Sequence, residues 1–507
     1  MSLQKQNIKE QLIKPLNTLC QKRFFPLLFI PLSIIFLLLF STTTSPLFIS
    51  EGLDSAVFKS MGQAIADGKV IYRDIFDNKG PILYFINAIP FFFGKGGFCR
   101  LLLFILQVIG LSSSMYFMFR MARLFAGGLW SFISLLVTCL LYIVFFEGGN
   151  LCEEWMLYGL APALYMATKW YIDLQKDKNN ALCSRRIIRD GFFYGLVFAY
   201  TLFIRPNDAV AFIGGLLLSV SILTMASGGK WDNLLYLYLS VFVGFSVITI
   251  PIVAWFAYHH ALVDLWNGMF GVNFGYVNGT ALIFSLPKVK IPLMLCVGMM
   301  LVLTHCCGGW KLLIMVGAPL LMMFLLIGHQ LFFHYYIPFV PFIALGICFM
   351  VKVPYHVSVM SALVLLLSQP ADSDGVNSPL LRMARHKIAA TFQSDCLTEK
   401  QFLNEGEMLT SQIPIEECSK VWNDLSSNYN LFSIFPHNRI VQCNRVIFNF
   451  GDNVVFQQHV LQKIEDASIL PLWVISTKDQ HDYFLYSDKS PYKEVLTTEH
   501  YSLFHLE

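Results

Sequence analysis

Charged residues are scarce in this chain. Of its 507 residues, 14% are charged, whereas 56% are hydrophobic and 15% aromatic; a soluble domain carries about 25% charged residues. A soluble globular protein is therefore excluded. A basic excess is missing as well, since 36 Lys and Arg face 33 Asp and Glu, for a net charge of +3. No nucleic-acid partner is expected, because such a partner selects for a basic face.

Metal-binding and disulfide spacings are also missing. The 12 cysteines form no CxxC pair and have no histidine at zinc-finger spacing, which argues against a zinc ribbon or a disulfide scaffold. Cys396, Cys418 and Cys443 lie in the polar C-terminal region. One disulfide among them, or free thiols packed as small apolar side chains, both remain open.

Long apolar runs fill the first 369 residues. A membrane-spanning helix needs about 20 mostly apolar residues, because the hydrocarbon core is about 30 Å thick and each residue rises 1.5 Å. The first run is not followed by a small-x-small cleavage site, so we interpret it as an uncleaved anchor. The stretch 191–226 is either two spans or one broken helix. Eleven spans are predicted: 24–42, 98–119, 125–146, 152–172, 191–206, 208–226, 234–257, 291–306, 311–328, 335–351 and 353–369.

The basic residues predict the orientation. With residues 1–23 in the cytoplasm, 16 of the 25 basic residues before residue 370 fall on the cytoplasmic side, as the positive-inside rule requires. An odd number of spans then places residues 370–507 outside. We expect a multi-pass protein of the bacterial inner (cell) membrane, with a periplasmic or extracellular C-terminal region.

Three regions are predicted: the cytoplasmic segment 1–23, a membrane domain over 24–369, and a soluble extracytoplasmic domain over 370–507. The last carries a net charge of −7 against +10 for residues 1–369. Strand-like patterns at 439–450, 472–476 and 483–486, with helical spacing at 398–428, predict a small α/β or α+β domain.

The first outer loop, 44–97, carries five acids. They are Glu51, Asp54, Asp67, Asp74 and Asp77. In its second half, 82–93 is apolar but too short to span, and we expect a short helix at the membrane interface. From composition alone, the acids are either a solvated set paired with nearby lysines and arginine or a group available for acid–base or metal chemistry.

The order of motifs in this loop resembles a known family. Asp54 is followed by Asp67-Gly68, then by Tyr72-Arg73-Asp74 and by Asp77-Asn78-Lys79-Gly80-Pro81. This run resembles the first outer loop of the GT-C glycosyltransferases, of the bacterial protein O-mannosyltransferase and lipid A aminoarabinose transferase type. The likeness continues in order through Gly97-Phe98-Cys99-Arg100-Leu101, Gly149 to Trp155, Phe203-Ile204-Arg205-Pro206-Asn207, and Phe333 to Pro338 with Pro341.

The resemblance implies a fold and an activity. The fold would be an α-helical polytopic membrane protein with about 11 transmembrane helices, GT-C-like, and a small C-terminal extracytoplasmic α/β domain. The activity would be transfer of a sugar, with inversion, from a polyprenyl-phosphate donor to a lipid, glycan or protein acceptor outside the cytoplasm.

The resemblance also implies roles for individual residues. Asp54 is the expected base, with Glu51 as its substitute, because the attacking acceptor must lose a proton. Arg205, Lys79 and Arg73 are expected to stabilise the leaving phosphate. No cofactor is certain; a divalent metal is left open, although no HxxH or carboxylate triplet supports one. Further residues expected to bind or orient substrate are Glu153, Glu154, Tyr72, Asp74, His334 and Tyr335.

Two other classes compete with a transferase. A secondary transporter or lipid-linked glycan flippase should show internal repeats and mid-membrane charges, and neither is found in the sequence. A polysaccharide polymerase or ligase with a large outer loop should lack the early acidic loop. Consumption of a polyprenyl-phosphate sugar by purified protein separates these readings.

Overall fold

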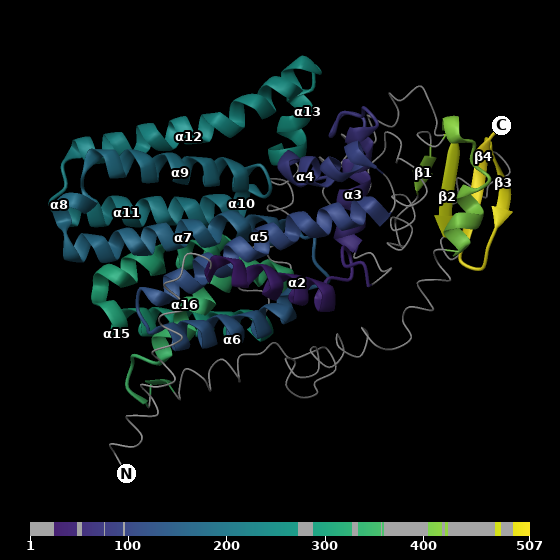
Figure 1. Ribbon diagram of the computed structural model, residues 1–507. Coiled ribbons are helices and arrows are strands. Elements are labelled where there is room, and N and C mark those ends of the chain that lie inside the picture. The colour runs from purple at the N-terminus through teal and green to yellow at the C-terminus, as the bar shows by residue number, and fades with distance from the viewer. Residues whose placement is uncertain are drawn as a thin grey trace, which may run out of the picture.

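A computed structural model describes residues 25–47, 53–75, 77–94, 97–271, 287–326, 333–355, 357–358, 404–417, 421–423, 472–477 and 490–507. Most of these are helical, and the long helices run side by side (Figure 1). The helices before residue 355 are η1 Phe25–Leu28, α2 Phe29–Phe40, α3 Leu53–Ala66, α4 Pro81–Phe93, α5 Gly97–Arg123, α6 Gly128–Phe146, α7 Cys152–Lys176, α8 Lys178–Ala181, α9 Ser184–Leu202, α10 Pro206–Ala209, η2 Val210–Gly214, α11 Gly215–Ala226, α12 Trp231–Tyr258, α13 Leu262–Trp266, η3 Asn267–Gly271, α15 Pro287–Leu326, η4 Phe333–Phe339 and α16 Val340–Met350.

The apolar helices make this an integral membrane protein. Four of those in the described ranges are long and apolar enough to cross a membrane: Phe98–Arg123, Pro206–Ala226, Trp231–Tyr258 and Met294–Leu326. Other predicted spans also coincide with helices, including α7 and α9, which contain more polar residues. Most of 353–369 lies outside the described residues. The total of about eleven spans therefore stays a prediction.

Two uncertain boundaries are settled by the backbone. Helix α9 ends at Leu202 and α10 begins at Pro206, so the stretch 191–226 forms two helical segments with a proline at the start of the second. Within α15, Gly309 has non-helical angles (φ 64°, ψ −163°). A Cβ at Gly317 would lie 2.9 Å from Leu301 Cδ2, yet a straight helix would separate these residues by about 24 Å. The two halves of α15 therefore fold back on each other.

Helix α7 lies at the centre of the bundle. Its first six residues, 152–157, are all buried, so every face of this turn contacts protein, and α7 packs against α5, α9 and η4. Helices α9 and α12 approach closely through glycine, since a Cβ at Gly195 would lie 2.1 Å from the Val241 carbonyl oxygen. Small residues permit such close backbone contact in membrane bundles. The buried first turn of α7 carries Glu153 and Glu154.

Two basic residues that the predicted topology places in the cytoplasm lie at turns of the bundle. Lys178, which begins α8, approaches Gly228, and the Lys352 ammonium lies 5.9 Å from the Phe125 ring centroid. Both contacts join turns between helices. Helix α8 lies at one end of the bundle, and α3, α4 and α13 lie at the other end (Figure 1). Which end faces the cytoplasm stays a prediction.

The first outer loop contains more helix than its composition suggested. Residues 53–66 form α3, whose Val57, Phe58 and Met61 are buried and which packs against α4. The short apolar helix expected at 82–93 is present as α4. A Cβ at Gly62 would lie 2.4 Å from the Asn87 carbonyl carbon, so α3 and α4 touch backbone to backbone. The acidic segment is thus held on a packed helical hairpin.

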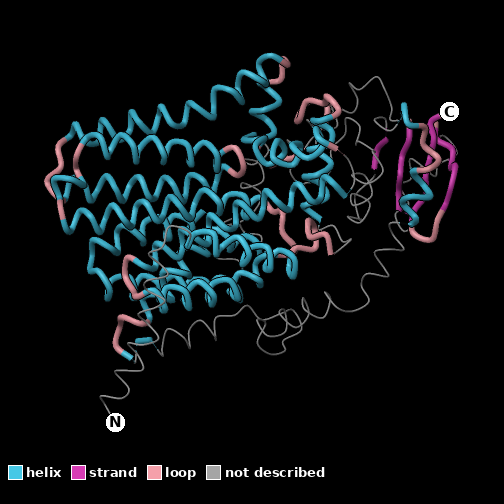
Figure 2. Tube along the Cα trace, viewed as in Figure 1, coloured by secondary structure: helices cyan, strands magenta, loops and turns pink. Residues whose placement is uncertain are grey.

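The described part of 370–507 contains a four-stranded sheet, drawn in magenta in Figure 2. Its order is β1-β2-β4-β3, with β1 parallel to β2 and the other pairs antiparallel. The strands are β1 Val421–Asn423, β2 Trp473–Thr477, β3 Tyr492–Thr497 and β4 Tyr501–Leu506.

The sheet agrees in part with the strand and helix patterns. The pattern at 472–476 coincides with β2. The helical expectation for 398–428 is wrong at β1, because Val421 to Asn423 pair with β2; residues 404–410 and η5 Ile415–Glu417 are helical. The patterns at 439–450 and 483–486, and Cys396, Cys418 and Cys443, lie outside the described residues. That 370–507 forms one domain stays a prediction.

Candidate functional site

Two loops that are distant in sequence meet at the α3–α4 end of the bundle. The Gly80 N–H donates to the Ile204 carbonyl oxygen (2.8 Å), and the Ile82 N–H donates to that of Phe203 (3.0 Å). A Cβ at Gly80 would lie 2.1 Å from the Phe203 oxygen, so only glycine permits this approach. Lys79 precedes Gly80 and Arg205 follows Ile204, so this contact brings the backbones of Lys79 and Arg205 close together.

Arg205 is held by two carboxylates and an aromatic ring. Its Nη1 pairs with Glu153 Oε1 from the first turn of α7 and lies 3.3 Å from Asp208 Oδ2. The guanidinium stands 4.1 Å from the centroid of the Tyr335 ring, a cation–π contact. Within the described residues, Nε and Nη2 have no hydrogen-bond acceptor, and the side chain is 16% exposed. These two nitrogens can therefore donate further hydrogen bonds.

Lys79 lies on a loop fixed by tyrosines. The Tyr84 hydroxyl donates to Asp77 Oδ2 (2.6 Å) and accepts from the Lys79 N–H (3.0 Å), and the Tyr72 hydroxyl donates to the Lys79 carbonyl oxygen (2.5 Å). Lys79 Nζ donates to Asn78 Oδ1 at 3.2 Å. Hydrogen bonds therefore hold the Lys79 backbone at both its N–H and its carbonyl oxygen. The partly exposed ammonium is held by Asn78.

Asp54 stands in the first turn of α3 with its carboxylate 29% exposed. Its Oδ2 lies 4.0 Å from His334 Nε2, and His334 Nδ1 lies 2.7 Å from Glu147 Oε2. Burial raises the pKa of Asp54 above its ordinary value, an effect that the positive charges of Lys79 and His334 oppose. Asp54 is thus a partly exposed carboxylate near Lys79 and His334.

Tyr72, Arg73 and Asp74 are engaged in contacts that hold the loop. The Arg73 guanidinium donates to the Asp74 carboxylate (2.8 and 3.0 Å) and to the His259 carbonyl oxygen (2.7 Å). Burial would raise the pKa of Asp74, but hydrogen bonds from Arg73 and the Val70 N–H hold it below its usual value. Arg73 thus joins the loop to the residue that follows α12, and Asp74 holds Arg73 in place; the donor-phosphate role of Arg73 and the substrate role of Asp74 stay predictions.

Glu154 is as completely buried as Glu153 and is surrounded by protein donors. It accepts from the Tyr158 hydroxyl (2.5 Å), from Gln107 Nε2 (2.9 and 3.0 Å) and from the Asn150 N–H (2.7 Å). Its side chain is fully buried. Glu154 therefore connects the start of α7 to α5 and to the turn before α7. Glu153 instead pairs with Arg205.

The structure thus brings together Asp54, Lys79, Glu153, Arg205, His334 and Tyr335 from the set predicted from the sequence. Glu51 lies outside the described residues. No site role was expected from the sequence for Glu147 or Asn150; Asp77 was expected only as one of the loop acids, and Asp208 only as an ion-pair partner of Arg205. The available signal for Glu147 and Asn150 was the segment Glu147-Gly148-Gly149-Asn150, where two glycines follow an acid at the predicted outer end of a span.

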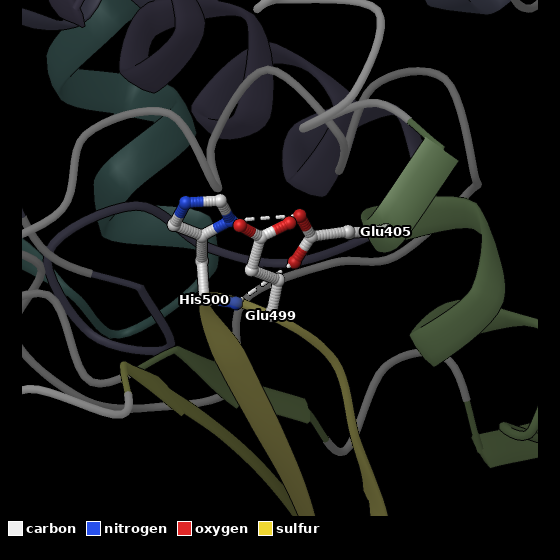
Figure 3. Close-up of side chains that lie close together, drawn as sticks. All are labelled: Glu405, Glu499 and His500. Atoms are coloured by element: carbon white, nitrogen blue, oxygen red, sulfur yellow. Dashed lines mark hydrogen bonds and ion pairs between the residues drawn. The ribbon is translucent and has the colours of Figure 1, made fainter.

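One group of potential metal ligands lies in the C-terminal region. Ligand atoms of Glu405, Glu499 and His500 lie within 4.8 Å of one another, the only such group of three found in the described ranges (Figure 3). Both Glu405 oxygens already accept protein hydrogen bonds, from His500 Nδ1 (2.7 Å), the Thr498 hydroxyl (2.7 Å) and the His500 N–H (3.0 Å). Burial would raise the pKa of Glu405, but these bonds lower it. The arrangement is explained as a tie between residues 404–410 and the β3–β4 turn.

Comparison with known proteins identifies the fold. No family model and no curated protein matches the sequence. The chain is similar to ArnT from Cupriavidus metallidurans bound to undecaprenyl phosphate, with a TM-score of 0.60, 14% identity, and coverage of 94% of this chain and 97% of that chain. The apo state of ArnT gives 0.59 and 13% over the same shares. The Archaeoglobus fulgidus oligosaccharyltransferase tethered with an acceptor peptide gives 0.51 and 12%, covering 90% of this chain and 70% of that chain.

ArnT, a lipid A aminoarabinose transferase, and the oligosaccharyltransferase are both GT-C proteins. The chain therefore has a GT-C fold over nearly its whole length, and the resemblance seen in the sequence is confirmed at the level of the fold.

Proposed function

We propose that this protein is a membrane glycosyltransferase. It moves a sugar from a polyprenyl-phosphate donor to an acceptor on the extracytoplasmic side of a bacterial inner membrane, and it inverts the anomeric configuration. The observation that carries the proposal is that Asp54 lies close enough to Lys79, His334 and Glu153 for their charges to act on it, while Glu153 pairs with Arg205, at one end of the helical bundle. This constellation contains a base and an anion site, the two groups that the reaction needs.

The proposed transfer is a single displacement. The acceptor hydroxyl or amine attacks the anomeric carbon, its proton passes to the Asp54 carboxylate, and the bond from carbon to the phosphate oxygen breaks with its electron pair leaving on phosphate. A positioned base contributes about 10²–10⁴-fold to such a step. Attack opposite the leaving group inverts the anomeric carbon, and no covalent enzyme intermediate forms.

Lys79 and Arg205 supply the charge that the leaving phosphate requires. Negative charge builds up on the phosphate as the bond breaks, and preorganised cations stabilise it more in the transition state than in the ground state. Arg205 is fixed through Nη1 by Glu153 and Asp208, which leaves Nε and Nη2 to bind phosphate oxygens. His334, fixed by Glu147, keeps Asp54 oriented.

The test is turnover of a polyprenyl-phosphate sugar by purified protein. Asp54→Asn should abolish transfer and leave donor binding nearly intact, because the amide keeps the shape but cannot take the proton. Asp67→Asn is the matched control, since Asp67 is an exposed acid just beyond the other end of α3, and it should retain activity.

Four results would change the proposal. Full activity in Asp54→Asn with loss in Glu51→Gln moves the base three residues upstream. Retention of the anomeric configuration excludes the single displacement. Movement of an intact lipid-linked glycan across the membrane without transfer indicates a flippase, and chain extension of a lipid-linked glycan indicates a polymerase or ligase.

The membrane orientation is tested separately with reporter fusions. Fusions after Lys178 and at the C-terminus should report opposite sides of the membrane. If both report the same side, the extracytoplasmic location of the site is wrong.

A further inference from the structure

A run of left-handed backbone leads into α7. Glu147, Gly148, Gly149 and Asn150 all have positive φ, of 40°, 88°, 86° and 56°. Asparagine tolerates this conformation better than most residues with a side chain. The turn places the Asn150 side chain, which is fully buried, among three helices.

The Asn150 side chain joins those three helices through its carboxamide. Its Nδ2 donates to Ser55 Oγ in α3 (2.8 Å) and to Asn87 Oδ1 in α4 (2.9 Å), and its Oδ1 accepts from Trp155 Nε1 in α7 (2.9 Å). The Asn150 N–H is bound by Glu154 (2.7 Å). A carboxamide has two donor hydrogens and an acceptor oxygen, so both donor hydrogens and the acceptor are in use.

The residue bound in α3 is the neighbour of Asp54. Ser55 is fully buried, so the Asn150 bond fixes the first turn of α3 from the protein side while Asp54 faces the site. The Asn150–Ser55 hydrogen bond thus connects two parts of the site. One is the first turn of α3, with the proposed base Asp54, and the other is the start of α7, where Glu153 pairs with Arg205. A shift of α3 relative to α7 changes the distance from the base to the phosphate-binding cations.

We propose that Asn150 is a positioning residue that sets the location of Asp54 relative to Arg205 and Lys79. The proposal rests on the proposed function for its kinetic consequence, but its structural part is independent of any activity. Aspartate cannot replace Asn150, because it lacks both donors and would bury a second carboxylate next to Glu154.

The experiment compares purified full-length wild type, Asn150→Ala and Asn150→Asp. Hydrogen exchange of the peptide that covers the first turns of α3 should be faster in both variants. With a polyprenyl-phosphate sugar, kcat should fall about 100-fold, the loss expected for a misplacement of about 1 Å, while KM for the donor changes less than about 3-fold. The acidic limb of the pH profile should move to lower pH, because water that enters beside a loosened α3 reduces the burial that raises the pKa of Asp54.

Two controls separate positioning from general instability. Asn233→Ala removes a bridging amide at the other end of the bundle, where Asn233 donates to Leu182 and accepts from Lys230; it should change neither the α3 exchange nor the pH profile. Ser55→Ala combined with Asn150→Ala should be no worse than Asn150→Ala alone, because both remove the same bond.

The outcomes are distinguishable. Unchanged exchange of α3 in Asn150→Ala overturns the proposal whatever the activity. If hydrogen exchange of α3 is faster in the variant but kcat and the acidic limb of the pH profile stay as in wild type, Asn150 does not position the base. A wild-type protein that transfers no sugar refutes the proposed function instead, and the exchange result then still decides whether Asn150 holds α3.

Discussion

The Arg205–Glu153 pair provides a direct test of the site. Glu153 is completely buried, Arg205 is 16% exposed and Asp208 is 6% exposed, so Arg205→Ala leaves two buried carboxylates without their cation. Removing one partner of a buried ion pair costs about 3–5 kcal/mol, mostly because the remaining charge is uncompensated. We expect the free energy of unfolding to fall by at least that amount. Glu153→Gln in the same protein removes one of the two orphaned charges, and the double variant should recover part of the loss.

Activity should not follow stability in this series. Arg205→Ala with Glu153→Gln should be more stable than Arg205→Ala alone but remain deficient in transfer, because the cation proposed to bind the phosphate is still absent. Arg205→Lys should keep the charge and lose the second donor nitrogen, so its kcat should lie between wild type and Arg205→Ala. The measurements are thermal denaturation in detergent and turnover of a polyprenyl-phosphate sugar.

A surface ion pair gives the matched control. Lys169 and Asp173 pair at 2.9 Å with side-chain exposures of 44% and 29%, so Lys169→Ala should cost at most about 1 kcal/mol. Equal stability of Arg205→Ala and the double variant would refute the reasoning, because it would mean that Glu153 is not left as an uncompensated charge. Recovery of transfer in the double variant would remove Arg205 from the phosphate site.

Three further predictions follow from the same geometry. Transfer should rise with pH through a value above about 3.9, the ordinary pKa of aspartate, because burial raises the pKa of Asp54 and only the deprotonated form accepts a proton; the profile of kcat/KM measures this. Gly80→Ala should lower stability by about 1–3 kcal/mol and weaken donor binding, since its Cβ would lie 2.1 Å from the Phe203 oxygen, whereas Gly298→Ala, with nothing within 4 Å, should be neutral in both assays. Glu154→Gln should cost about 1–3 kcal/mol in thermal denaturation, because an amide cannot accept from all the donors around the carboxylate.

The helices were predictable because spanning segments are a local property of sequence. A run of about 20 apolar residues is sufficient to indicate a helix in a bilayer, and the proline at residue 206 marks where one helix begins. Helix α3 was expected only as a loop, since its polar composition hid an apolar face formed by Val57, Phe58 and Met61. Strand β1 was missed because its conformation depends on pairing with β2, which lies about 50 residues away.

The candidate site was predictable as a set of residues but not as a set of contacts. The resemblance in motif order pointed to Lys79 and Arg205, while the approach of their backbones depends on the contact of Gly80 with Phe203, about 120 residues away. No local pattern shows that Arg73 turns toward the end of α12 or that Glu147 holds His334. Those outcomes depend on which helix ends the fold places together.

Among the acids at this end of the bundle, Asp54 is the one whose carboxylate accepts no hydrogen bond within the described residues. Asp77 is bound by Tyr84 and the Asn78 N–H, Glu147 by His334, Glu154 by at least three donors, and both Glu153 and Asp208 by Arg205. Asp54 has His334 at 4.0 Å as its nearest charged partner within the described residues, and burial raises its pKa. The hydrogen bonds that occupy the neighbouring acids therefore leave the Asp54 oxygens open to a proton from a bound acceptor, which is the role proposed for this residue.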